Sequence, residues 1–158
     1  MGKHNEPEWA KWESDFAEMV DAQKVRLSGR LSLFKGDVKD DFILADCKYT
    51  SGEFYRLTED TWEKLADWAR NESRFPVLAV KTMDAQLVVV PQDFYYELVR
   101  NPPTPRLKTE IAYKTRNLGF MQSLREPVLF VVGKYKLAAY SCECFVNDLI
   151  SYEERMTV

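Results

Sequence analysis

Two acids and a lysine surround one short apolar segment in the first third of the chain. Asp37 precedes the apolar run from Phe42 to Ala45, and Asp46 and Lys48 follow it. Because side chains alternate along a strand, Asp46 and Lys48 are expected on one face and Cys47 on the other. A charged pair at the end of a buried strand is costly unless the charges have partners or a chemical task.

Phosphodiester hydrolysis is a task that suits these residue types. Carboxylates hold a hard divalent cation, the cation activates a bound water and stabilises charge on the phosphate, and a nearby ammonium orients that water. We therefore expect Asp37, Asp46 and Lys48 to form a metal-dependent nuclease site that uses Mg²⁺, with Mn²⁺ as a substitute. The alternative is a surface hairpin with an ordinary ion pair, because Asp-x-Lys is a common sequence.

A helix and a strand pair must position these residues. Apolar residues at helical spacing predict a helix over residues 7–22, and a pair of strands is expected over 25–49. A tight turn at 39–41 would pair Asp37 with about Ile43, which leaves Asp46 about 10 Å further along the strand. Gly36 could relieve this separation by a bend or bulge. The residues expected to pack that first helix into the core are Trp9, Trp12, Phe16, Met19 and Val20.

The turn itself offers two alternative first acids. Asp40 and Asp41 are close enough in sequence to replace Asp37, but their types favour solvated turn residues.

The rest of the first hundred residues alternates between helix and strand. Thr58 or Asp60 can cap a helix, and strands are expected at 76–80 and 87–90, followed by a short helix over 94–99. This order predicts an α/β fold with a mixed central sheet flanked by helices. The buried stripe of the capped helix is expected to be Trp62, Leu65, Ala66 and Ala69.

The order of these segments resembles a known nuclease superfamily. The segments Arg26-Leu27-Ser28-Gly29-Arg30, Gly36-Asp37 and Asp46-Cys47-Lys48, with the helix and strand after them, resemble the PD-(D/E)xK nucleases. Within that superfamily they are similar to the archaeal-type Holliday junction resolvases and their phage-encoded relatives. The resemblance covers residues 10–98. It implies a restriction-endonuclease-like nuclease core over 1–100, with 101–158 as a C-terminal extension of the same domain.

The resemblance also implies roles for individual residues. Asp37 corresponds to the acid of the family's PD element, with Gly36 where proline often stands. Asp46 matches the second acid, which these resolvases more often fill with glutamate, and Lys48 matches the lysine. Cys47 occupies the variable position whose backbone carbonyl often ligates the metal in the family.

The first helix and the following segment supply the remaining expected site residues. Glu13 is the best match for the family's first-helix glutamate as a metal ligand, and Glu8 and Glu18 remain open. Ser28 and Arg30 fall where the family carries a serine and basic residues close to the scissile phosphate. The resemblance further implies four-way junction DNA as substrate, a role in DNA recombination, and a homodimer that makes two symmetric cuts.

Charge is distributed unevenly around an acidic average. The net charge of −3 argues against broad nonspecific coating of DNA. Local basic clusters can still bind phosphates, although a solvated helix face explains the C-terminal cluster equally well. The expected DNA contacts, besides Ser28 and Arg30, are Arg26, Lys35, Arg106, Lys108 and Lys114.

Length and composition agree with a small enzyme. A chain of 158 residues suits one domain, and it contains neither a signal peptide nor an apolar run long enough to span a membrane. Three cysteines without a zinc-ligand pattern indicate reduced thiols, so we expect a cytoplasmic protein, in the host cytoplasm if phage-encoded. His4 is the single histidine, which excludes a histidine-based triad.

The C-terminal part hints at a repeat of the part before it. At an offset of 51, Pro76-Val77-Leu78 meets Pro127-Val128-Leu129 and Phe94 meets Phe145. No copy of Asp46 and Lys48 appears at that offset, so we expect residues 106–158 to extend the sheet or to form a dimer contact. Two rival functions remain: a PD-(D/E)xK exonuclease or restriction-type enzyme, and a non-catalytic DNA-binding or scaffold protein.

Overall fold

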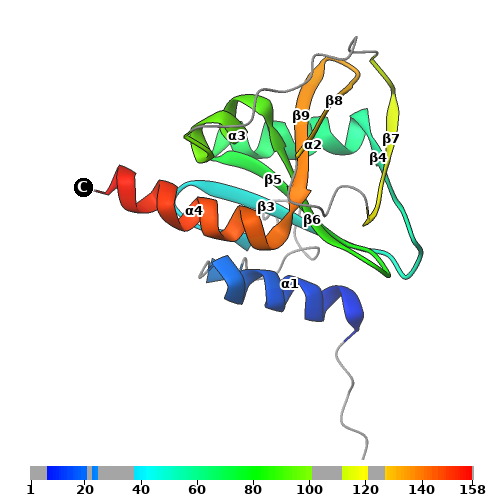
Figure 1. Cartoon of the computed structure of the whole chain (residues 1–158), viewed down its shortest axis with the longest axis horizontal. Coiled ribbons are helices and arrows are strands. Elements are labelled where there is room, and N and C mark those ends of the chain that lie inside the picture. The colour runs from blue at the N-terminus through cyan, green and yellow to red at the C-terminus, as the bar shows by residue number, and fades with distance from the viewer. Residues whose placement is uncertain (1–6, 21–22, 25–37, 101–111, 121–126, 158) are drawn as a thin grey trace, which may run out of the picture.

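The computed structural model describes residues 7–20, 23–24, 38–100, 112–120 and 127–157 (Figure 1). The described elements begin and end with a helix, and groups of two to four strands lie between successive helices. Their bounds are α1 (Glu8–Val20), β1 (Gln23–Lys24), β2 (Val38–Lys39), β3 (Ile43–Tyr49), β4 (Tyr55–Thr58), α2 (Glu59–Asn71), β5 (Phe75–Lys81), β6 (Gln86–Pro91), α3 (Gln92–Leu98), β7 (Thr115–Leu118), β8 (Val128–Val132), β9 (Tyr135–Ser141) and α4 (Cys142–Met156).

Most strands join one mixed sheet. Seven strands follow the order β1-β2-β3-β5-β6-β9-β8, while β4 and β7 form a separate two-stranded antiparallel ribbon. The pair β3 and β5 is parallel, and α2 is the helix in the connection between them; the other neighbours in the sheet are antiparallel. The predicted α/β class with a mixed central sheet flanked by helices is confirmed.

Helices lie on both faces of the sheet (Figure 1), and each face packs into its own apolar cluster. On one face α1, α3 and α4 pack around Phe16, Phe94 and Phe145. On the other face α2 and the β4–β7 ribbon pack around Leu57 and Trp62. Alternation along β3 divides its residues between the layers, because Ile43 and Ala45 face the α1 side whereas Leu44 faces the α2 side.

The first helix follows the predicted stripe with one exception. Trp12, Phe16 and Val20 are buried, and the Trp12 indole N–H donates to the Ala79 carbonyl at 3.1 Å. The expectation that Trp9 packs in the core is wrong, because its side chain is 59% exposed. Trp9 lies in the first turn of α1, before the stretch of the helix that covers the sheet.

The second helix begins as its sequence predicts. Thr58 is the N-cap, and its hydroxyl accepts a hydrogen bond from the Thr61 backbone N–H at 3.1 Å. Trp62, Leu65 and Ala69 form its buried stripe, while Ala66 is partly buried. This amphipathic helix covers β3 and β5, which a parallel pair of strands requires of its connecting segment.

The C-terminal strands extend the same sheet and repeat an earlier pairing. In the β5–β6 hairpin Leu78 faces Val89, and in the β8–β9 hairpin Val128 faces Ala139, each fifty residues further along. Helices α3 and α4 also begin fifty residues apart. The structural offset is therefore fifty, one less than the offset that the sequence matches suggested. Among the described residues, no helix is both long and apolar enough to cross a membrane.

Candidate functional site

The β2–β3 hairpin determines where the expected acids lie, and its turn differs from the expected one. Val38 pairs with Ala45 and Lys39 with Leu44. The expected tight turn at 39–41, which would have paired Asp37 with Ile43, is therefore wrong. The observed turn lies further along the chain and runs from Asp40 to Ile43.

The Asp40 side chain closes this connection. Its carboxylate accepts from the backbone N–H groups of Phe42 and Ile43, both at 2.8 Å, and its own N–H donates to the Ile43 carbonyl at 3.1 Å. Asp41 is exposed in the same turn. Both residues therefore have the surroundings of turn residues, as their types favoured.

The observed register differs from the one on which the expected separation of the two acids was based. The gap of about 10 Å followed from pairing Asp37 with Ile43, whereas the described ladder pairs Val38 with Ala45 and Lys39 with Leu44. Asp37 itself lies outside the described residues.

Asp46 and Lys48 form the charged pair of the site. Lys48 Nζ lies 3.4 Å from Asp46 Oδ2, with the lysine side chain 40% and the aspartate side chain 14% exposed. Cys47 packs toward the opposite layer, as alternation predicts. The pair thus stands at the carboxyl end of β3, on the α2 side of the sheet.

A tyrosine that the sequence did not single out lies near this pair. Burial raises the pKa of Tyr55, the nearby charge of Lys48 lowers it, and the charge of Asp46 raises it. Tyr55 comes from β4, a short strand of the separate ribbon. No pattern in the sequence predicted that this ribbon would bring a phenol close to β3.

Glu13 lies on the α1 side of the sheet, next to the residue that contacts the β5 partner of Cys47. It is one of three polar or charged residues buried among those described, at 5% exposed. Its neighbour Trp12 bonds the carbonyl of Ala79, which is the β5 partner of Cys47. Glu13, Asp46, Cys47 and Lys48 each also interact with further residues, so none of these groups is free.

The two other candidate glutamates of α1 have different surroundings. Glu8 and Glu18 are exposed. Of the three, Glu13 alone is buried beside the sheet, but α1 lies on the face opposite Asp46 and Lys48, so the structure does not bring Glu13 together with that pair.

Several expected site residues cannot be placed. Within the described part of the chain, no group of three or more histidine, cysteine, aspartate or glutamate side chains is arranged to hold a metal. Lys114 is described, and it is exposed just before β7, with its carbonyl accepting from the Glu59 N–H at 3.0 Å. The expected residues outside the described ranges are Arg26, Ser28, Arg30, Lys35, Asp37, Arg106 and Lys108.

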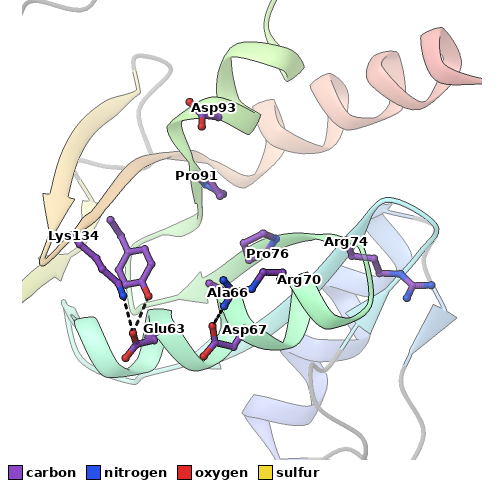
Figure 2. A pocket seen from close by; sticks show the side chains of 10 residues that line it. Glu63, Ala66, Asp67, Arg70, Arg74, Pro76, Pro91, Asp93 and Lys134 are labelled. Atoms are coloured by element: carbon purple, nitrogen blue, oxygen red, sulfur yellow. Dashed lines mark hydrogen bonds and ion pairs between the residues drawn. The ribbon is translucent and has the colours of Figure 1, made fainter.

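A pocket of about 570 Å³ opens elsewhere, between α2 and the start of α3 (Figure 2). Lys134 Nζ lies 3.3 Å from Glu63 Oε1, and the Tyr135 hydroxyl donates to the same oxygen at 3.1 Å. These two hydrogen bonds, Lys134 first, lower the pKa of Glu63. Arg70 pairs with Asp67 on the α2 wall.

This pocket has little in common with the expected site. Its charged side chains largely neutralise one another, and none of its lining residues belongs to β3. We therefore take the carboxyl end of β3, and not this pocket, as the candidate functional site.

Comparisons of the chain with protein-family models, with curated proteins and with solved structures find no match.

Proposed function

We propose that this protein is a Mg²⁺-dependent DNA endonuclease of the PD-(D/E)xK type that cuts four-way junctions. One observation carries the proposal: Asp46 and Lys48 lie 3.4 Å apart at the carboxyl end of a buried strand. The sequence adds Asp37, which directly precedes the strand that pairs with β3. An acid-acid-lysine set at one strand end is the arrangement that metal-assisted phosphodiester hydrolysis requires.

The order of elements is consistent with this proposal. A helix, an antiparallel strand group, a crossover helix and a parallel strand follow one another in α1, β1–β3, α2 and β5. This is the order that the sequence predicted for a restriction-endonuclease-like core. The specific fold family remains part of the proposal.

The available donors suit a hard cation. The Asp46 carboxylate and the Cys47 carbonyl are oxygen donors, and Asp37 would add a carboxylate. Glu13 belongs to the helix on the opposite face of the sheet, so it would not share a metal with Asp46. A bound Mg²⁺ would supply an activated water and neutralise charge on the phosphate. Lys48 would orient that water, because its ammonium stands beside Asp46 and its side chain is partly open to solvent.

Two other functions compete with junction cleavage. Another nuclease of the same type, an exonuclease or a restriction-type enzyme, would use the same residues on a different DNA. A non-catalytic DNA-binding or scaffold protein would need neither the carboxylate of Asp46 nor the ammonium of Lys48 for its activity. Cutting assays on several DNA structures separate the first rival, and substitution of Asp46 separates the second.

The experiment compares four-way, flap, single-stranded and linear DNA with Mg²⁺ and with EDTA. Asp46→Asn should abolish cleavage while DNA binding stays intact or strengthens, because one negative charge facing phosphate is removed. Asp41→Asn is the matched control, since Asp41 is an exposed acid in the same hairpin. Equal cutting by Asp46→Asn and the parent would show that this site assignment is wrong.

Junction cleavage also requires two active sites in one complex, so we propose a homodimer with C2 symmetry. Strand β8 lies at the edge of the large sheet, where the apolar residues Val128 to Val132 either stabilise a dimer contact or only extend the sheet. Tyr113 pairs with Val132 at one end of this edge. Sedimentation at micromolar concentration tests the dimer, and a strict monomer would contradict it. We propose that the enzyme acts in the cytoplasm, which is the host's if the protein is phage-encoded.

A further inference from the structure

Three large apolar side chains are exposed at the end of the sheet that carries the candidate site. Phe54 is 60%, Met83 59% and Phe120 54% exposed. Apolar groups of this size in solvent mark a contact surface when they lie together. They come from the β3–β4 connection, the β5–β6 turn and the end of β7.

These three residues, which we name the apolar tip, are brought together by backbone contacts. A Cβ added to Gly119 would lie 2.6 Å from a Phe54 ring carbon, so the Phe54 ring rests directly on Gly119, the neighbour of Phe120. The Met83 N–H donates to the Gly52 carbonyl at 2.9 Å, which joins the β5–β6 turn to the segment before Phe54.

The apolar tip adjoins the charged pair. Tyr55, the chain neighbour of Phe54, is close enough to Lys48 and Asp46 for both charges to act on its pKa. The Thr50 N–H donates to the Lys81 carbonyl at 2.9 Å, so the chain leaving β3 stays beside the turn that carries Met83. A molecule held at Asp46 would therefore meet the apolar tip.

We propose that the apolar tip stacks against nucleobase faces that are left unstacked at a DNA branch point, next to the strand cut at Asp46. This inference rests on the proposed function and names the structural feature of the DNA that the site selects. Base faces stack on aromatic side chains in a way that tolerates any sequence. A continuous duplex presents no free base faces, whereas a branch point does.

Charge and size favour nucleic acid over a protein partner. The exposed cation Arg56 lies on β4 two residues after Phe54, and Lys48 is partly exposed near Tyr55, the chain neighbour of Phe54. Basic groups interleaved with aromatic ones are typical of surfaces that bind single-stranded DNA. A stable protein interface uses about 20–30 residues on each side, far more than three side chains supply.

The test measures binding of a four-way junction and of a linear duplex by fluorescence anisotropy. All proteins carry Asp46→Asn so that the DNA stays uncut. The variant is Phe54→Ala with Phe120→Ala, and the matched control is Ile150→Ala with Met156→Ala, which removes exposed apolar groups from α4. Figure 1 shows the end of α4 on the opposite side of the molecule from the β5–β6 turn. Phe54→Trp, which keeps an aromatic face, tests rescue.

Junction binding should weaken about 5- to 150-fold for each stacked base that is lost, while duplex binding stays unchanged. The control pair and Phe54→Trp should bind the junction like the parent. Unchanged junction binding by the double alanine variant, with a parent that prefers junctions, would overturn the inference and leave the nuclease standing. A parent that binds neither DNA would overturn both proposals. A change in sedimentation without a change in DNA binding would instead assign the apolar tip to a protein contact.

Discussion

Asp40→Ala is the substitution that tests how the site hairpin is built. The carboxylate of Asp40 accepts two backbone hydrogen bonds at 2.8 Å, from Phe42 and Ile43, within the turn that sets the pairing of Val38 with Ala45. A hydrogen bond to a charged group contributes about 1.5–3 kcal/mol when buried. Asp40 is only partly buried, so water can replace part of each bond. We therefore expect a total loss of about 1–2 kcal/mol in the free energy of unfolding, as for loss of a helix cap.

Urea unfolding measures this loss, and Asp41→Ala is the control. Asp41 is exposed in the same turn, so its substitution should change stability by less than about 0.5 kcal/mol. In thermal unfolding the Asp40→Ala variant should melt about 2–8 °C lower. Cleavage should fall as well, because a slip of one residue in this hairpin would move β2, which follows Asp37 in the sequence, while the pairing with β5 keeps β3 and Asp46 in place. Equal stability of the two variants would refute the turn; full stability with no cleavage would make Asp40 an acid of the site.

Three further predictions follow from single residues. Gly133→Ala should destabilise the protein by about 1–3 kcal/mol in urea unfolding, because Gly133 has a φ of +58° and an added Cβ would lie 1.6 Å from Glu59 Oε2. Gly52→Ala is the control and should change stability little, because the Cβ that it adds would meet no atom closer than 3.5 Å. Burial raises the pKa of Cys142 to about 12, so iodoacetamide at pH 8 should leave this protonated thiol unmodified until the protein unfolds. Alkylated Cys142 detected by mass spectrometry in the native protein would contradict its burial. Glu13 belongs to the helix on the sheet face opposite Asp46, so Glu13→Gln should give a folded protein that cleaves DNA like the parent. Loss of cleavage together with weaker Mn²⁺ binding would show instead that Glu13 supplies a metal ligand.

The parts of the fold that could be predicted from sequence are those governed by local rules. Thr58 caps α2 because a hydroxyl at that position can accept a free helix N–H, and the stripe of Trp62 and Leu65 follows from helical period. The buried strand around Leu44 follows from its apolar run. These features depend on neighbours within a few residues, which the sequence displays directly.

The parts that could not be predicted depend on contacts between distant segments. The hairpin register depends on the two hydrogen bonds that the Asp40 side chain accepts from backbone N–H groups. The sequence is equally compatible with a tight turn at 39–41, which would give a different register. No local pattern predicts that the ribbon of β4 with β7 brings Tyr55 to the charged pair, because those strands are about sixty residues apart and carry no pairing pattern. Trp9 fits the helical stripe yet is exposed, since the period alone does not say where a helix leaves the sheet.

The candidate site itself was only partly predictable. The type and spacing of Asp46 and Lys48 predicted one face of one strand, and the 3.4 Å ion pair agrees with that geometry. The contribution of α1 could not be ranked from sequence, because Glu8, Glu13 and Glu18 all fit the spacing. Burial separates them, since Glu13 alone is enclosed beside the sheet.

Cleavage of a labelled four-way junction by the parent and by Asp46→Asn, each with Mg²⁺ and with EDTA, is the decisive test of the proposed nuclease site. We expect symmetric cuts by the parent only with Mg²⁺, and a folded Asp46→Asn variant that binds the junction without cutting it. No cleavage of any DNA by the folded parent with Mg²⁺ or Mn²⁺, or equal cleavage by the variant, would contradict the proposal.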